Sequence, residues 1–136
     1  MENKIDQYLI DMMLTYEQID STTWLLDDEE RSLQSVVVMK VESMVIVRAE
    51  IMDIPKNNLL ELYAKLLELN ATDVFHGAYA LDTDNKKIII INTLNYDSMD
   101  YDDFRSSLEA FSLALATHYP ILSKFREKPA SSAVGA

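Results

Sequence analysis

The order of hydrophobic patterns along the chain constrains its fold more than any other feature. Apolar residues recur at spacings of three and four from Ile5 to Ile19, over residues 59–69 and over residues 101–119. This spacing is typical of amphipathic helices. Runs rich in β-branched residues lie between them, three before the middle helix and two after it. The sequence therefore predicts the order helix, three strands, helix, two strands, helix.

The predicted strands form one antiparallel sheet. Only two residues separate the second and third strands, and so short a connection permits little other than an antiparallel pair. Pro55 stops the third strand, because proline lacks the N–H that a sheet ladder needs. The expected strands cover residues 21–26, 33–41, 44–52, 74–81 and 87–94. The predicted fold class is α+β, with an antiparallel sheet flanked by helices.

Length and composition favour a single domain. The chain has 136 residues, of which 49% are hydrophobic and only two are glycine, so one sizeable core can form. Residues 128–136 are small and show no periodicity, which predicts a disordered tail. We therefore expect one domain over residues 1–127. Asp100 is expected to cap the last helix, and Pro120 to end or kink it.

The charge distribution limits the classes of partner that can be expected. Twenty-three acidic against twelve basic residues give a net charge of −11, and the basic residues are scattered. A nucleic-acid partner is not expected, because binding a phosphate backbone needs clustered cations. The apolar runs are too short to span a bilayer, so no membrane association is expected. The absence of cysteine and of a signal peptide's apolar segment predicts a cytoplasmic protein without disulfides.

No motif for a catalytic, metal or cofactor site is present. Residues 82–87 begin like an EF-hand loop, but Lys87 stands where that loop requires glycine and Thr93 where it requires glutamate. The two histidines, His76 and His118, lie outside any metal-binding spacing, so structural roles are expected for both. The protein is thus expected not to be an enzyme. Carboxylates brought together only by folding would leave no motif, so an enzyme stays an open alternative.

Two apolar surfaces exceed what one small core requires. If Val45, Val47, Ala49 and Ile51 face the core, the third strand points Met44, Ile46 and Met52 outward together with Arg48 and Glu50. That face either binds a partner or is covered by the tail or a helix. The middle helix carries leucines over about half its circumference, wider than the stripe that covers a sheet. It either meets a second subunit or is deeply buried.

Short sequences carry a resemblance to a known superfamily. They are Leu-Leu-Glu-Leu-Asn at residues 66–70, Gly-Ala-Tyr-Ala-Leu-Asp at 77–82, four isoleucines at 88–91 and Asp-Tyr-Asp-Asp-Phe at 100–104. With the element order, they resemble the class I type III secretion chaperones, a CesT-like superfamily that includes the YbjN-like proteins. The resemblance covers about residues 1–125.

The resemblance implies a function and contact residues. Such chaperones are non-enzymatic dimers that present apolar patches to an extended segment of a secreted client. By position, Met44, Ile46 and Met52 would contact the client. Candidates for the contact between subunits of the expected homodimer are Leu62, Tyr63, Leu66 and Ile89. YbjN-like proteins share the fold without that role, so a regulatory protein without a secreted client is the alternative.

Overall fold

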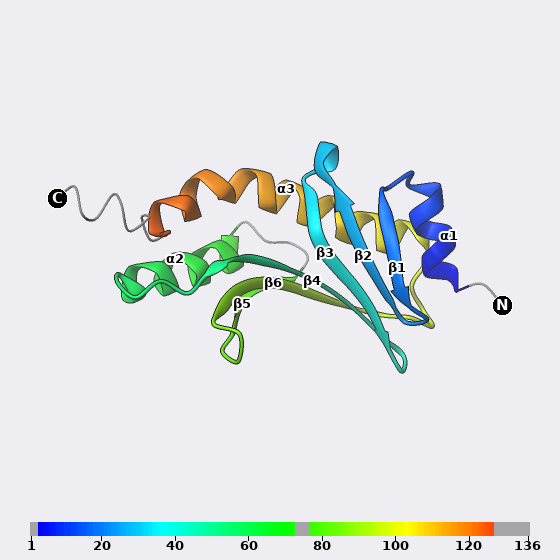
Figure 1. Cartoon of the computed structure of the whole chain (residues 1–136), viewed down its shortest axis with the longest axis horizontal. Helices are drawn as coiled ribbons and strands as arrows, with labels where there is room; N and C mark the ends of the chain where they lie inside the picture. The colour runs from blue at the N-terminus through cyan, green and yellow to red at the C-terminus, as the bar shows by residue number, and fades with distance from the viewer. Residues whose placement is uncertain (1–2, 73–76, 127–136) are drawn as a thin grey trace.

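Six antiparallel strands and three α-helices form the chain in the computed structural model, which describes residues 3–72 and 77–126 (Figure 1). The elements are α1 (Lys4–Asp11), β1 (Tyr16–Asp20), β2 (Thr23–Asp28), β3 (Leu33–Val41), β4 (Met44–Asp53), α2 (Leu59–Thr72), β5 (Ala78–Asp82), β6 (Lys87–Asn95) and α3 (Tyr101–Leu122). The strands lie in the order β1-β2-β3-β4-β6-β5, and every neighbouring pair is antiparallel. The predicted α+β fold class is confirmed.

The first helix is shorter than predicted, and a fourth strand precedes α2. α1 ends at Asp11, and Met13 adopts a left-handed backbone conformation with a φ of 57° that no α-helix continues through. Tyr16 then pairs with Leu26, which makes residues 16–20 the edge strand β1. Tyr16 and Ile19 follow the helical spacing, but pairing with β2 provides backbone partners that a longer helix would otherwise supply. Periodicity alone could not separate the two outcomes.

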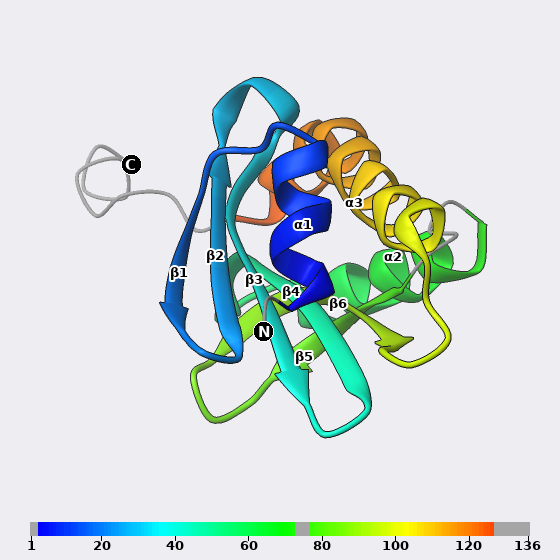
Figure 2. The ribbon, with the colours of Figure 1, turned by 90° about the vertical axis from the view of Figure 1, so that its right-hand side faces the viewer.

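One face of the sheet packs against α1 and α3, which lie on the same side of the strands (Figure 2). α1 is held by the indole N–H of Trp24, which donates to Asp6 Oδ1 at 2.6 Å, and by the complete burial of Ile5 and Leu9. α3 is held by Asn92 of β6, whose amide donates to Ser107 Oγ at 2.7 Å. The helices and this inner face of the sheet therefore share one core.

The last helix begins where the sequence predicts and ends later. Asp100 accepts from the Asp103 N–H while Asp103 accepts from the Asp100 N–H, a capping box that satisfies two backbone donors. Pro120 does not end the helix, which runs to Leu122 and continues as the 3₁₀ turn η2 (Ser123–Phe125). So close to the end of α3, the hydrogen bond that proline removes is among the last of the helix.

Asp28 joins three segments near the start of β3. Its side chain is only 5% exposed and follows the register shift between Leu26 and Asp28. It accepts from the Thr15 N–H at 3.1 Å, from the Arg31 N–H at 3.3 Å and from the Arg31 guanidinium at 2.7 Å. The Thr15 N–H, followed by Arg31, lowers the pKa of Asp28 below its usual value despite burial. This carboxylate therefore ties the chain before β1 to the 3₁₀ turn η1 (Glu29–Arg31).

Replacing Asp28 should destabilise the fold. We expect Asp28→Ala to lower the free energy of unfolding by about 1–3 kcal/mol, because it leaves two backbone donors without their acceptor. Asp27→Ala is the matched control, since Asp27 is the exposed neighbour and should change stability by less than about 0.5 kcal/mol. Urea unfolding at neutral pH measures both. Equal effects of the two substitutions would contradict this role.

The same network predicts how stability depends on pH. A lowered folded-state pKa means that the stabilisation by Asp28 is complete above the unfolded pKa, about 3.9, and is lost as the pH falls through the folded value. The difference in stability between the wild type and Asp28→Ala should therefore be constant from neutral pH down to about 5 and shrink below about 4. Urea unfolding across that pH range measures it, and a difference that grows on acidification would contradict it.

Candidate partner-binding surface

The second face of the sheet carries large apolar side chains that no helix buries. Cross-strand pairing places them on one face: Leu25 opposes Val37, Met39 opposes Ile46, and Val41 opposes Met44. Ile91 joins them through its pairing with Arg48. We call this surface the outer sheet face, and its apolar members are Leu25, Val37, Met39, Val41, Met44, Ile46 and Ile91.

Exposure separates the two faces of the sheet. On β4, Val45 and Val47 are completely buried, whereas Met44, which precedes Val45, is 45% exposed. Ile46 is half-buried, as are Val37, Met39 and Ile91. Val41 is 48% exposed. The predicted outward orientation of Met44 and Ile46 is therefore what the structure has, whereas their role as partner contacts stays a prediction.

The prediction that Met52 faces outward is wrong. The register between β4 and β6 shifts between Glu50 and Met52, where Glu50 opposes Ile89 and Met52 opposes Ile88. The extra residue reverses the alternation, because successive side chains of a strand point to opposite faces. Met52 consequently enters the core with 8% of its surface exposed. Ile51, expected in the core, is only half-buried and lines two surface cavities.

An ion pair lies among the apolar residues of the outer sheet face. Arg48 on β4 donates to Asp82 Oδ2 at 2.9 Å, although β6 separates their strands. A hydrogen bond from the Asn85 side chain, followed by one from Arg48, lowers the pKa of Asp82. The carboxylate is thus ionised at neutral pH and compensates the guanidinium. The outer sheet face therefore holds this internally paired charge couple among its apolar residues, while the exposed carboxylates of Glu17 and Glu50 lie on the same face of the strands.

Helix α2 has two apolar faces. Leu62, Leu66 and Leu69 pack into the core, while Leu60 is 86% exposed and Leu67 is 69% exposed. The outward residues Leu60, Ala64, Leu67 and Ala71 follow one another at spacings of four, three and four, which places them on one side of the helix. We call these four residues the α2 stripe. The wide leucine arc is thus divided between this chain's own core and an exposed stripe.

The residues expected at a subunit contact lie mostly inside the chain. Leu62 is completely buried, Leu66 is 5% exposed and Ile89 is 4% exposed. Tyr63 is half-buried against the core. Ile89 opposes Glu50 and Ala80, and lies outside the main core cluster although it is buried. Burial within one chain leaves Leu62, Leu66 and Ile89 little surface to offer a second copy, and sequence periodicity could not show which half of the helix faces inward.

The described residues include one of the two histidines considered as candidate site residues, and they hold no cluster of potential metal ligands. His118, 2% exposed on α3, shares a 2.7 Å hydrogen bond between its Nδ1 and the hydroxyl of Tyr79. This contact joins α3 to β5, in agreement with the structural role expected for His118. His76 and the expected tail lie outside the described residues. In residues 3–72 and 77–126, no cluster of three or more potential metal ligands occurs, and no helix is long and apolar enough to cross a membrane.

The sequence matches the family CesT_Tir_1 over residues 1–128. The chain belongs to the CesT_Tir_1 family. The match spans every described helix and strand, so the resemblance inferred from the short sequences is confirmed. No curated protein sequence matches the chain.

Solved structures of the CesT_Tir_1-like fold support the architecture. A chain of the heterodimeric complex ExoU–SpcU, from the type III secretion system of Pseudomonas aeruginosa, is similar with a TM-score of 0.70 and 18% identity, covering 87% of this chain and 97% of that one. YbjN from E. coli, described as a putative transcription regulator, has a TM-score of 0.61 and 19% identity, covering 85% and 88%. A chain of the HopA1–SchA chaperone–effector complex has a TM-score of 0.62 and 8% identity, covering 85% and 89%.

The reversed alternation in β4 makes a prediction about its two terminal methionines. Met52→Ala should lower the free energy of unfolding by about 2–5 kcal/mol, because it leaves a cavity in the core. Met44→Ala, the same change at the exposed end of the strand, should cost less than about 0.5 kcal/mol. Chemical denaturation measures both values. Comparable losses would mean that β4 alternates without the shift at Glu50–Met52.

Proposed function

We propose that this member of the CesT_Tir_1 family is a non-enzymatic, dimeric, cytoplasmic protein that binds an extended segment of a client polypeptide on its outer sheet face. The observation that carries the proposal is the open apolar surface around Met44 and Ile46. When a partner covers exposed apolar surface of this kind and removes it from water, the free energy of the system falls, which favours binding. The complexes of similar fold with effector proteins support a polypeptide as that partner.

The composition of the outer sheet face suits an extended chain. Met39 and Met44 have unbranched, flexible side chains that adapt to differently shaped apolar partners. Side chains from four neighbouring strands form rows into which alternate side chains of an extended segment can pack. Arg48 and Asp82 place one polar feature in this array, which would favour a client with a polar group at the matching position.

The α2 stripe is the proposed contact between two copies of the chain. Leu60 and Leu67 are among the most exposed leucines of the described residues, and the small Ala64 and Ala71 beside them let a second helix approach closely. Spacings of four and three match the seam along which two helices pack. The expected dimer would therefore use the outward half of α2 rather than Leu62 and Leu66.

Client binding should be lost when charged residues replace apolar residues of the outer sheet face. We expect Met44→Asp with Ile46→Asp to reduce client co-purification from the native cell at least about tenfold, because both carboxylates must be desolvated on binding. Quantitative mass spectrometry of stoichiometric partners measures it. Leu113→Asp is the matched control, since Leu113 is 66% exposed on α3 and away from that face.

Circular dichroism must first show that the double variant keeps the wild-type secondary structure. A folded double variant that retains its client, or an equal loss with Leu113→Asp, would contradict the proposal.

The dimer contact has its own test. Light scattering of the wild type at micromolar concentration should give twice the chain mass of 15.6 kDa, and Leu60→Asp with Leu67→Asp should give a single chain mass. Leu113→Asp should leave the dimer intact, because Leu113 lies on another helix and is 66% exposed, close to the 69% of Leu67. A wild type of single chain mass would rule out the proposed contact.

A regulatory protein is the second candidate, because YbjN shares the fold over most of both chains. It is distinguished by the same co-purification experiment. A regulator would yield no stoichiometric secreted client, while its deletion would change transcript levels.

A further inference from the structure

The sheet forks between β3 and β4. Their pairing runs from Val41 opposite Met44 to Val36 opposite Ala49 and stops there. β3 nevertheless begins at Leu33, where it pairs with Asp28 of β2, and β4 continues to Asp53, where it pairs with Lys87 of β6. The two strands therefore diverge, each following its other neighbour (Figure 1). Residues 33–35 and 50–53 form the two arms of this fork.

Local backbone features hold the fork open. Ser35 has a φ of 55°, a left-handed conformation that interrupts the pleat of β3. β4 carries its register shift between Glu50 and Met52, at the corresponding end of the common ladder. Bulges bend a strand and end pairing with a neighbour. The facing edges of the two arms consequently form no ladder with each other.

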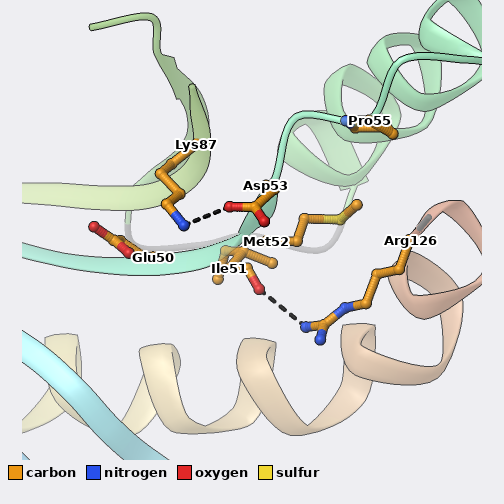
Figure 3. Close-up of a pocket in the computed structure, with 7 residues that line it drawn as sticks. All are labelled: Glu50, Ile51, Met52, Asp53, Pro55, Lys87 and Arg126. Atoms are coloured by element: carbon orange, nitrogen blue, oxygen red, sulfur yellow. Dashed lines mark hydrogen bonds and ion pairs between the residues drawn. The ribbon is translucent and has the colours of Figure 1, made fainter. Parts of the chain in front are cut away.

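A cavity of about 590 Å³ occupies the fork. Gln34 and Ser35 line it from β3, Glu50 and Ile51 from β4, and the C-terminal half of α3 closes it with Leu115, His118 and Leu122. An adjoining cavity of about 380 Å³ shares Glu50, Ile51 and Arg126 (Figure 3). The fork thus opens onto apolar side chains and leads into a second hollow along β4.

The charges at the fork favour a cation. Glu29 and Glu50 line the larger cavity, both are exposed, and neither forms an ion pair with another residue of the described ranges. Arg126 lines both cavities and keeps its positive charge, because its partners are the neutral Ile51 carbonyl at 2.9 Å and the Tyr119 ring, whose centroid lies 5.2 Å away. In the larger cavity, two carboxylates therefore face one guanidinium. Lys87, in the smaller cavity, pairs with Asp53 (Figure 3). The Asp53 carboxylate, followed by the charge of Glu50, raises the pKa of Lys87, so Glu50 already has one cation nearby.

We propose that the fork is a second binding site, which takes an extended polypeptide segment carrying a lysine or arginine side chain. The segment's backbone would pair with the facing edges of β3 and β4, as in strand addition to an open sheet edge. The Ile51 carbonyl is not among the groups it would meet, because that carbonyl already accepts from Arg126. Its cationic side chain would meet Glu29 and Glu50, and its apolar neighbours would contact Ile51, Leu115 and Leu122. The net charge of −11 raises the local concentration of a cationic segment.

A designed peptide tests the site. The probe is acetyl-Ser-Thr-Val-Lys-Val-Thr-Ser-amide, added to the full chain at low salt and followed by backbone amide shifts in NMR spectra. We expect the largest shifts at residues 33–35 and 50–53. A peptide with glutamate in place of lysine should bind more weakly, and one with N-methylated valines, which cannot donate to a strand edge, should not bind.

Two double variants test the charges. Glu29→Gln with Glu50→Gln should weaken binding of the lysine peptide roughly fivefold, the combined loss of two partly exposed ion pairs. The matched control is Glu17→Gln with Glu61→Gln, which makes the same change in net charge at exposed residues of β1 and α2. Binding to the control should equal that of the wild type.

The outcomes separate this site from the outer sheet face. The absence of amide shifts at about 1 mM peptide would overturn the proposal, because a Kd of about 1 mM already corresponds to a weak binding free energy of about −4 kcal/mol. Equal weakening in both double variants, or equal binding of the glutamate peptide, would also overturn it. Shifts confined to Met39, Met44 and Ile46 would place the peptide on the outer sheet face, which overturns the fork site and supports the proposed function.

Discussion

Burial of one sheet face, and only one, determines the rest of this structure. Trp24, Leu26 and the inner valines of β3 and β4 pack with Phe104, Leu108 and Phe111 of α3 into a single core. α1 and the inward half of α2 contribute to the same core. The core-facing sides of all three described α-helices therefore pack on one side of the strands. The outer sheet face and the α2 stripe are left in contact with water because nothing in the described ranges remains to cover them.

The sequence predicted the fold class because its patterns are mostly local. The two-residue turn at residues 42–43, the cap at Asp100 and the β-branched runs each depend on a few neighbouring residues, and the antiparallel pairing of the strands around that turn follows from the short connection. The sequence did not predict β1 because Tyr16 and Ile19 satisfy the helical spacing, and only the pairing of residues 16–18 and 20 with β2 decides otherwise. The left-handed backbone conformation of Met13, which separates α1 from β1, cannot be recognised from the hydropathy pattern.

The candidate site was predictable in part for a related reason. Alternation along β4 correctly predicted that Met44 and Ile46 face outward. A one-residue shift in register, set by pairing with β6, places Met52 in the core instead. The arc of leucines on α2 left open a subunit contact or deep burial, because the choice of inward residues depends on how the helix docks. Likewise, the fork between β3 and β4 is a property of three-dimensional pairing and has no motif in the sequence.

The two edges of the sheet bear on how a molecule with an open apolar face stays dispersed. β1 and β5 have five residues each, and β1 exposes Glu17 and Asp20. Short strands with charged side chains discourage copies from joining edge to edge into larger sheets. Such a molecule can keep its outer sheet face available for specific association while its edge strands resist polymerisation. Neutralising the acidic residues of β1 would therefore favour aggregates built by sheet extension.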